Sequence, residues 1–161
     1  LYLAKDTLKK AQAALDENGL SDVIICPETM GKINQLGTLD EVLELCGVDE
    51  RFVPTVDFGH LNARTLGGIR GRDDYAKMLD DIENALGFER LSKMHVHFSK
   101  IEYTNGGEKK HLTFADKTFG PDYEPLFEEI KRRSLEPSVI CESDGTQAED
   151  AAEMRRFYES L

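Results

Sequence analysis

The sequence has few cysteines, and they follow no pattern that would build a zinc finger or a set of disulfides. Only Cys26, Cys46 and Cys141 are present, an odd number with no metal-site spacing. Free thiols in a reducing cytoplasm are the simplest interpretation. Cys26 and Cys141 lie in short apolar stretches, so we expect both to pack as small hydrophobic side chains. We therefore expect a cytoplasmic location.

Long apolar runs are also lacking. No stretch approaches the ~20 apolar residues that a membrane-spanning helix needs, so no membrane association is expected. No basic segment precedes a short apolar one, which is the pattern of a signal peptide. Apolar residues make up 40% and charged residues 32% of the 161 residues, an ordinary composition for a globular protein. We expect a single domain over residues 1–161, because no repeat, linker or low-complexity segment divides the chain.

Positive charge is scarce. The chain has 20 Lys and Arg against 31 Asp and Glu, for a net charge of -11. Non-specific nucleic-acid binding depends on cations that neutralise phosphates, so this charge weighs against it. A basic track or a bound metal ion can reverse the local field, so a DNA substrate remains open.

Hydrophobic periodicity predicts helices and short apolar strands in strict alternation. Two capping boxes, Thr38 with Glu41 and Thr146 with Glu149, mark the expected starts of two helices. Short apolar runs bounded by turn residues suit strands buried on both faces. The expected helices are 1–18, 38–47, 74–86, 122–134 and 146–161, and the expected strands are Val23–Cys26, Arg51–Asp57, Met94–Ser99 and Ser138–Cys141.

This alternation indicates an α/β fold with a parallel sheet built from right-handed crossovers. The segment 100–120 is long for a loop between a strand and a helix, and it contains Asn105-Gly106-Gly107. Loops of that length in compact domains are usually functional or mobile.

Each expected strand delivers a carboxylate or an imidazole at its carboxyl end, which is where chemistry sits in parallel α/β folds. The chain has only four histidines, and we place none of them on a helix. The side chains concerned are Glu28, Asp57, His60, His95, His97, His111 and Glu142.

Imidazole and carboxylate groups at rigid positions suit zinc, with manganese or iron as alternatives. A carboxylate that bridges two metal ions could support a phosphoryl displacement. Each residue taken alone has a plainer interpretation: a single Glu or Asp is more often a helix cap or an ion-pair partner, and a single His is often a core residue. We favour metal binding because these plain interpretations must hold at all four strand ends together.

At these residues the chain resembles the endonuclease IV (apurinic/apyrimidinic endonuclease) family, over its whole length. The elements that carry the resemblance are Pro27-Glu28-Thr29-Met30-Gly31-Lys32, the Asp-x-x-His of Val56–His60, the His-x-x-x-Ser-Lys of His95–Lys100, Lys109-Lys110-His111 where the family has Asp-x-His, and Cys141-Glu142-Ser143.

The resemblance implies a TIM barrel that cuts DNA 5′ to abasic sites with three zinc ions. It implies that this chain provides the last four β/α units, a half-barrel. It also implies that Glu28 bridges two zinc ions, and that Glu28 and Glu142 act in catalysis. The further ligands implied are Asp57, His95 and Glu142 for one ion, and His60 and His111 for the third.

Two departures from the family pattern affect these expectations. Lys109 stands where the family has an Asp ligand, and a cation cannot bind zinc; Glu108 could substitute if the chain shifts by one residue. Two histidines that complete the first zinc site of the family come from earlier strands, so this chain alone is expected to be incomplete for activity, with two or three ions in the complete protein.

The expected function is therefore zinc-dependent phosphodiester hydrolysis at abasic sites in DNA repair, with Lys109 and Lys110 as candidate phosphate contacts. One alternative is a metal-dependent isomerase or epimerase of the same superfamily, acting on a small sugar or sugar phosphate. Another is a non-catalytic metal-binding or interaction module. A half-barrel also exposes strand edges, so we expect homo-oligomers of the isolated chain.

Overall fold

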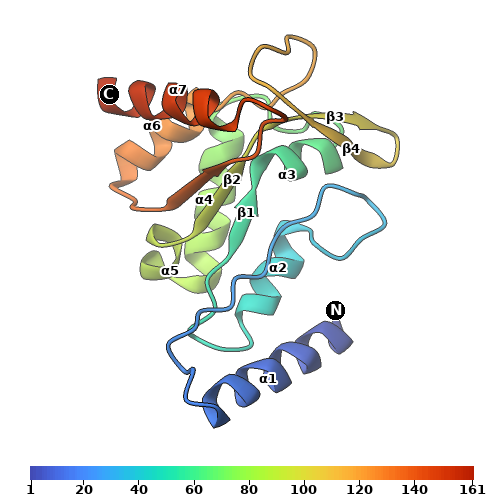
Figure 1. Ribbon diagram of the computed structural model, residues 1–161, viewed down its shortest axis with the longest axis vertical. Helices are drawn as coiled ribbons and strands as arrows, with labels where there is room; N and C mark the ends of the chain where they lie inside the picture. The colour runs from blue at the N-terminus through green and yellow to red at the C-terminus, as the bar shows by residue number, and fades with distance from the viewer.

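The structure is a computed structural model that describes residues 1–161. A sheet of three parallel strands has helices packed on one side, and Figure 1 also shows a projecting hairpin and an N-terminal helix set apart from the body. The helices are α1 (Tyr2–Glu17), α2 (Leu39–Cys46), α3 (Phe58–Arg64), α4 (Arg72–Leu86), α5 (Phe88–Ser92), α6 (Glu124–Arg133) and α7 (Gln147–Ser160). The strands are β1 (Thr55–Asp57), β2 (His95–Phe98), β3 (Lys100–Thr104), β4 (Gly107–Leu112) and β5 (Ser138–Cys141).

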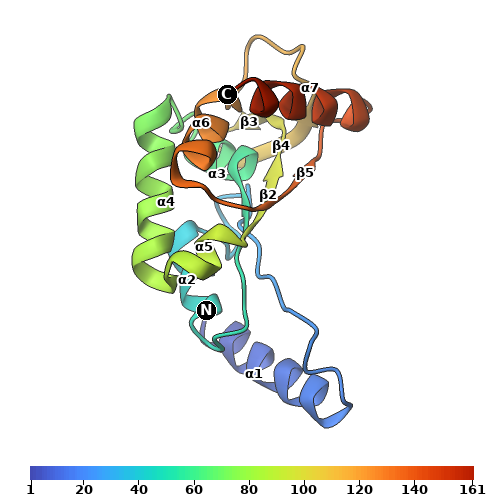
Figure 2. The same cartoon turned by 90° about the vertical axis from the view of Figure 1, so that its left-hand side faces the viewer.

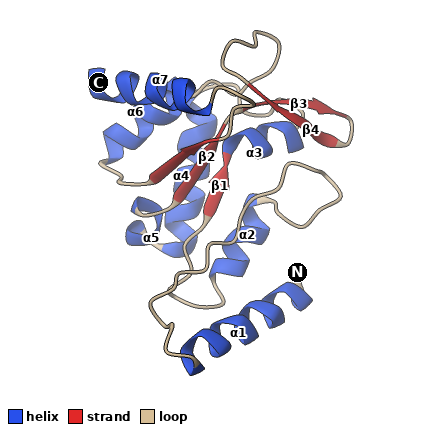
Figure 3. Cartoon of the chain, viewed as in Figure 1, coloured by secondary structure: helices blue, strands red, loops and turns tan.

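The main sheet has the order β1-β2-β5, and both pairings are parallel. The chain returns from β1 to β2 through α3, α4 and α5, and it reaches β5 through the β3–β4 hairpin and α6 (Figure 3). The expected α/β fold with parallel strands is confirmed. In the register, Asp57 lies beside His97, and His97 lies beside Ile140, so the carboxyl ends of the strands share one edge.

The expected strand Val23–Cys26 is wrong. Val23 and Ile24 are 44% and 57% exposed, not buried on both faces. The chain becomes strand-like a few residues later, where backbone hydrogen bonds join 25–29 to 53–55 in parallel along β1. No strand lies on the other side of this segment, and Pro27 has no N–H to offer. The ladder therefore stays incomplete, and the segment forms an edge of the sheet.

The segment expected to be a long loop contains a second, antiparallel sheet. β3 and β4 pair across the turn at Asn105-Gly106. An Asn-Gly pair between two strands is a strong hairpin signal, and in this turn the following residue, Gly107, takes the positive φ of 89°. The loop expectation is therefore wrong for Lys100–Thr104 and Gly107–Leu112, although residues 113–122 do form an irregular segment that projects beyond the hairpin (Figure 1).

The helix starts differ in their capping. At α2 the box is confirmed, because Glu41 N donates to Thr38 Oγ1 at 3.2 Å and Thr38 N donates to Glu41 Oε2 at 2.9 Å. At α7 the expected box is absent, since Thr146 Oγ1 donates to Asp150 Oδ2 at 2.9 Å instead. The same carboxylate accepts from Phe114 N at 3.0 Å, which ties the start of α7 to the segment after the hairpin.

Two short helices, α3 and α5, were not expected, because helices of seven and five residues are too short to show a clear period. The expectation that no histidine lies on a helix is wrong for His60, which is in α3. α3 begins directly after β1, where Asp57 Oδ1 accepts from His60 N at 2.7 Å and caps the helix.

The hydrophobic core lies between the sheet and its covering helices (Figure 2). Val56, Val96 and Phe98 point to this side and are fully buried. The opposite face is partly open, since His97 is half-buried and Ile140 is 48% exposed. The three cysteines are free thiols; Cys46 and Cys141 are buried as small core side chains. None of the helices is both long and apolar enough to cross a membrane.

A buried carboxylate fastens α4 to α6. Glu129 is 2% exposed and accepts hydrogen bonds from Arg72 Nε at 2.7 Å, Arg132 Nη2 at 2.6 Å and Arg133 Nε at 3.0 Å. These guanidinium groups, with Arg132 first, lower the pKa of Glu129 to about 2. Because this carboxylate is more acidic in the folded chain than its ordinary value of 4.5, its charge stabilises the fold above that pH.

Glu129→Gln should lower the free energy of unfolding at pH 7 by ~1–3 kcal/mol, because the charge-assisted hydrogen bonds from Arg72, Arg132 and Arg133 weaken. The deficit should shrink as the pH falls from about 4.5 toward about 2, where the wild-type carboxylate gains its proton. Urea unfolding at several pH values measures both effects. Glu128→Gln, at a more exposed carboxylate 3.7 Å from Arg72, is the matched control and should change stability by less than ~0.5 kcal/mol. Equal effects of the two variants would contradict this role of Glu129.

Candidate metal centre

Four acidic and imidazole side chains meet at the carboxyl edge of the main sheet. Glu28 lies in the edge segment 25–29 and forms a parallel β-bridge with Thr55 of β1. Asp57 ends β1, His97 lies on β2, and Glu142 follows β5. One ligand-type atom from each of the four lies within 4.8 Å of the others. We call these four residues the first cluster. Parallel pairing produces it, because strands in register end side by side.

Within the first cluster, His97 lies between two carboxylates. Its Nδ1 is 3.1 Å from Glu28 Oε1 and 3.3 Å from Glu142 Oε1. The hydrogen bond to Glu28 and the charge of Glu142 raise the pKa of His97, despite partial burial. The same hydrogen bond lowers the pKa of Glu28. The cluster therefore gathers negative charge and favours any cation that enters it.

Asp57 gives the clearest sign that the first cluster fits a metal ion. Its side chain is fully buried, and Oδ2 has no hydrogen-bond partner. The nearest ring nitrogen, His60 Nδ1, is 3.3 Å away but is directed at the carbonyl oxygen of Thr29. Burial raises the pKa of Asp57 to about 6. A buried, unpaired carboxylate oxygen is costly, and a bound cation would satisfy it.

His95, the histidine expected as a ligand, is not part of the first cluster. It starts β2, pairs with Thr55 and Ser138, and lies on the same face as His97 but ~6.6 Å earlier along the strand. His97 takes the expected place instead. The His-x-x-x-Ser-Lys resemblance points to His95, whereas the geometry selects the histidine nearer the carboxyl end of β2.

A second cluster lies beside the first and consists of His60 on α3 with Glu108 and His111 on β4. Ligand-type atoms of the three also lie within 4.8 Å of one another. His60 Nε2 is 3.5 Å from Glu108 Oε2, and His111 Nε2 is 3.9 Å from Glu108 Oε1. The two clusters are adjacent, because His60 Nδ1 is only 3.9 Å from Glu28 Oε1.

A β-bulge explains why Glu108 and not Lys109 faces the second cluster. In a regular strand, side chains three positions apart point to opposite faces. The hairpin register shifts between Glu102 and Tyr103, so that Lys109 is the extra residue of the bulge. The bulge brings Glu108 and His111 to the same face. Glu108 thus occupies the place where the resemblance would put an aspartate one residue later.

The hydrogen bonds of the two histidines show that the second cluster also fits a cation. His60 Nδ1 is 2.9 Å from Thr29 O, and a carbonyl can only accept, so Nδ1 carries a hydrogen. In a neutral His60 ring, Nε2 then has no hydrogen, so two hydrogen-bond acceptors, Nε2 and the Glu108 carboxylate, face each other. A metal ion between them would resolve this contact. His111 Nδ1 contacts Ser99 Oγ at 2.8 Å, which holds the ring and leaves Nε2 toward Glu108.

The two candidate phosphate-binding lysines lie on the outside of the hairpin. The side chains of Lys109 and Lys110 are 55% and 58% exposed. Both are paired with Glu102 on β3. They lie next to the second cluster in sequence but take no part in it.

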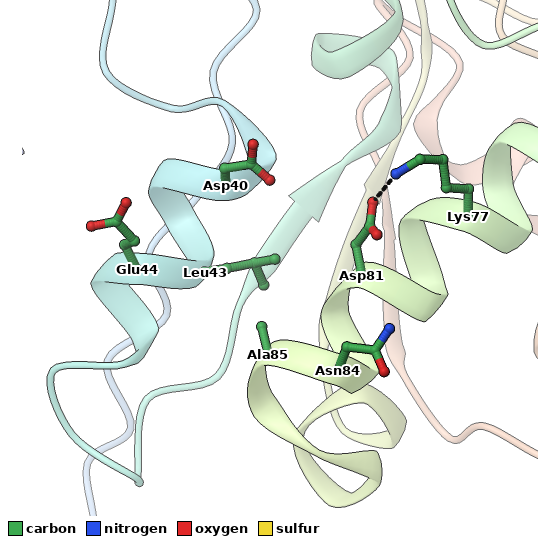
Figure 4. Close-up of a pocket in the computed structure, with 7 residues that line it drawn as sticks. All are labelled: Asp40, Leu43, Glu44, Lys77, Asp81, Asn84 and Ala85. Carbon is green, nitrogen blue, oxygen red and sulfur yellow. Dashed lines mark hydrogen bonds and ion pairs between the residues drawn. The ribbon is translucent and has the colours of Figure 1, made fainter.

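A separate groove of about 540 Å³ lies between α2 and α4 (Figure 4). Asp40 and Glu44 approach it from α2, and the ion pair of Lys77 with Asp81, at 2.6 Å, lines it from α4. No residue of either cluster lines this groove. It belongs to the helical side of the molecule and is not part of the candidate metal centre.

Sequence reasoning missed several residues that shape the centre. Thr29 and Ser99 hold the rings of His60 and His111, and both are fully buried. Both lie within the motifs that carry the family resemblance, but those motifs assigned them no role. Glu108 was considered only as a substitute, and the Asn-Gly turn could have placed it by fixing the hairpin register.

The chain belongs to the xylose isomerase-like TIM-barrel family, whose model matches residues 3–161. This superfamily includes apurinic/apyrimidinic endonucleases and sugar isomerases. The chain is also similar to an uncharacterized protein of Methanocaldococcus jannaschii, with 37% identity over 140 residues. The match covers 87% of this chain and 50% of that protein, so the chain spans about half the length of this relative.

His97→Ala and His95→Ala form a matched pair on one face of β2. Only His97 is a member of the first cluster, so His97→Ala should weaken metal binding there by ~10-fold or more, and His95→Ala should leave it unchanged. Equilibrium dialysis with zinc, followed by elemental analysis, measures this. If His95→Ala caused the larger loss, the assignment of His97 would be wrong.

Glu108→Gln and Lys109→Gln test the bulge in the same manner. Glu108 faces His60 and His111, so its neutral amide should cost the chain one bound metal equivalent. Lys109→Gln removes the charge of the neighbouring residue but changes no side chain of the second cluster, so the metal content should stay at the wild-type value. Elemental analysis after dialysis distinguishes the two. Loss of metal in both variants would show that local charge, not ligation, controls binding.

Proposed function

We propose that the chain carries most of the metal centre of an endonuclease IV-like enzyme, which hydrolyses a phosphodiester bond 5′ to abasic sites in DNA. The observation that supports this most is the second cluster, because adjacent metal sites suit phosphoryl displacement, where two oxygens need stabilisation. Zinc is the metal that the ligand set favours, with manganese or iron as alternatives. Bound ions would supply Lewis-acid charge at the phosphate and at the leaving 3′ oxygen.

The side chains of the two clusters would have distinct roles. Glu28 lies 3.1 Å from His97 and 3.9 Å from His60, so its carboxylate can serve both clusters and act as the bridge. Glu142 has a side chain that is 32% exposed, so it can reach a substrate or accept a proton from an attacking water. Asp57 is fully buried, so its carboxylate would bind a metal ion but would not touch the substrate.

Lys109 and Lys110 are proposed to contact DNA phosphates. In the free chain Glu102 pairs with both, so DNA would have to compete with this carboxylate. Both side chains are more than half exposed, and exposed ion pairs contribute little, so the exchange would cost little. The role of these lysines stays a prediction.

The second candidate function is a metal-dependent isomerase or epimerase that acts on a small sugar or sugar phosphate. Two observations favour it. The four side chains of the first cluster all come from this chain, so a single metal site would need no further ligand. The net charge of -11 also opposes DNA more than it opposes a small sugar.

We also propose that β1, β2, β5 and the edge segment 25–29 are the last four strand positions of an eight-stranded barrel. Three features support this: the family match, the relative of about twice the length, and the uncovered face of the sheet. On this proposal, the two remaining histidines of the first zinc site would come from the other half.

Metal stoichiometry and substrate cleavage together test the function. The 161-residue chain and the full-length Methanocaldococcus jannaschii relative should each be loaded with zinc, analysed for metal, and incubated with abasic duplex DNA or an open-chain sugar phosphate. Two or three ions in the full-length protein, and cuts 5′ to the abasic site that Glu28→Gln reduces more than ~100-fold, are expected. One ion with sugar turnover would favour the isomerase. Weak or absent metal binding would favour a non-catalytic module.

The isolated chain is proposed to self-associate through its open edges. The outer side of β5 and the segment 25–29 carry unpaired backbone groups, and Tyr2, Leu3 and Ile140 are 82%, 76% and 48% exposed. Sedimentation at micromolar concentration should therefore show dimers or larger species. A stable monomer that melts cooperatively would mean that the open edges are tolerated.

A further inference from the structure

Arg64 is the last residue of α3, and its guanidinium contacts four backbone carbonyl oxygens of one loop. Nη1 donates to Met30 O at 3.2 Å and to Lys32 O at 2.7 Å. Nη2 donates to Ile33 O at 3.2 Å and to Gln35 O at 2.8 Å. No carboxylate lies within ion-pair distance of Arg64. Its charge-assisted hydrogen bonds are thus all given to the segment 30–37, which we call the Met30–Gly37 loop.

The Met30–Gly37 loop holds the tip of the β3–β4 hairpin in turn. Glu108 N donates to Gly31 O at 3.0 Å, and Ile33 N donates to Gly106 O at 3.1 Å. An antiparallel bridge pairs Lys32 with Gly107. Arg64 therefore forms hydrogen bonds with the same part of the loop that contacts the residues around Glu108.

Gly31 brings the loop directly against the second cluster. A Cβ added at Gly31 would lie 2.6 Å from Glu108 Cβ, 2.7 Å from Glu108 Oε2 and 3.0 Å from His60 Cδ2. No side chain fits there. The loop backbone therefore forms one wall of the second cluster, and a small displacement of the loop would move the carboxylate of Glu108.

Helix α3 reaches the second cluster from two directions. His60 and Arg64 are four residues apart on α3, so their side chains leave the same face of the helix. His60 supplies a ring nitrogen directly, whereas Arg64 acts through the Met30–Gly37 loop on Glu108. α3 thereby positions His60 directly and Glu108 indirectly, and both side chains must lie beside the same ion.

We propose that Arg64 is a positioning residue for the second metal site: by holding the Met30–Gly37 loop, it keeps Glu108 opposite His60 and His111. This inference rests on the proposed occupation of that site by a metal, but it does not depend on which substrate is turned over. It predicts that the loss of Arg64 lowers metal affinity at the second cluster selectively, and leaves the first cluster intact.

The test uses the 161-residue chain with cobalt as the metal probe, read by elemental analysis and by the visible absorption of bound cobalt. Arg64→Ala should weaken the second site by ~10–100-fold, the range typical of residues that orient ligands, and should reproduce the spectrum of Glu108→Gln. Added methylguanidinium should restore the missing absorption in Arg64→Ala and not in Glu108→Gln. Gly31→Ala should show the same selective loss, without rescue.

Arg90→Ala is the matched control. Arg90 also donates to backbone carbonyls, at Leu86 O (2.9 Å) and Cys46 O (3.1 Å), but it does so away from both clusters. This variant can lose stability, yet its cobalt content and spectrum should stay at the wild-type values. If Arg64→Ala does not fold, Arg64→Lys, which keeps the charge without the fork, is judged by the same readouts.

Three results would overturn the inference: wild-type cobalt binding in Arg64→Ala, equal losses from both clusters, or no second-site cobalt in the wild-type chain. Selective loss with rescue in this chain, together with a full-length Methanocaldococcus jannaschii relative that cuts no abasic DNA, would reject the proposed nuclease function and leave the role of Arg64 standing. Cleavage of abasic DNA by that relative, together with an unchanged second site in Arg64→Ala, would reject the role of Arg64 and leave the nuclease function standing.

Discussion

The fully buried carboxylate of Asp57 is the constraint on which the rest of the centre depends. Its backbone N–H donates to Thr29 Oγ1 at 2.9 Å, which fastens the edge segment to β1. Its Oδ1 starts α3 by accepting from His60 N, and α3 carries both His60 and Arg64. Its Oδ2 has no partner. One side chain thus joins the sheet edge, the capped helix and an unsatisfied charge site, so any change at Asp57 affects both clusters together.

The fold was largely predictable from the sequence, because long amphipathic helices and apolar strands have clear periods. α4 and β5 lie close to their expected ranges, and the strand ends were expected to meet because parallel strands end at one edge. The predictions failed where tertiary contacts decide the local structure. Residues 23–26 form no strand, because a second neighbouring strand is missing there. α3 is too short for a period, and the hairpin lies in a polar segment.

The candidate site was predictable as a set of residue types but not in its detail. Glu28, Asp57 and Glu142 meet as expected, since each ends or follows a strand. The choice of His97 over His95 depends on where β2 ends relative to its neighbours, which motif spacing does not encode. Thr29, Ser99 and Arg64 position parts of the site through backbone and hydroxyl contacts with residues 12 or more positions away in the sequence. A local sequence pattern does not predict such contacts.

The bulge at Lys109 has a consequence for how relatives of this chain should be compared. A column-by-column alignment would match a regular Asp-x-His strand to Lys109-Lys110-His111 and would score the metal ligand as lost. In this chain the extra residue of the bulge places the carboxylate of Glu108, one position earlier, on the same face as His111. One extra residue in a strand can therefore turn a neighbouring acid toward the face that a lysine in the sequence pattern would otherwise leave without a carboxylate, so relatives with a lysine at this position are best compared by strand register.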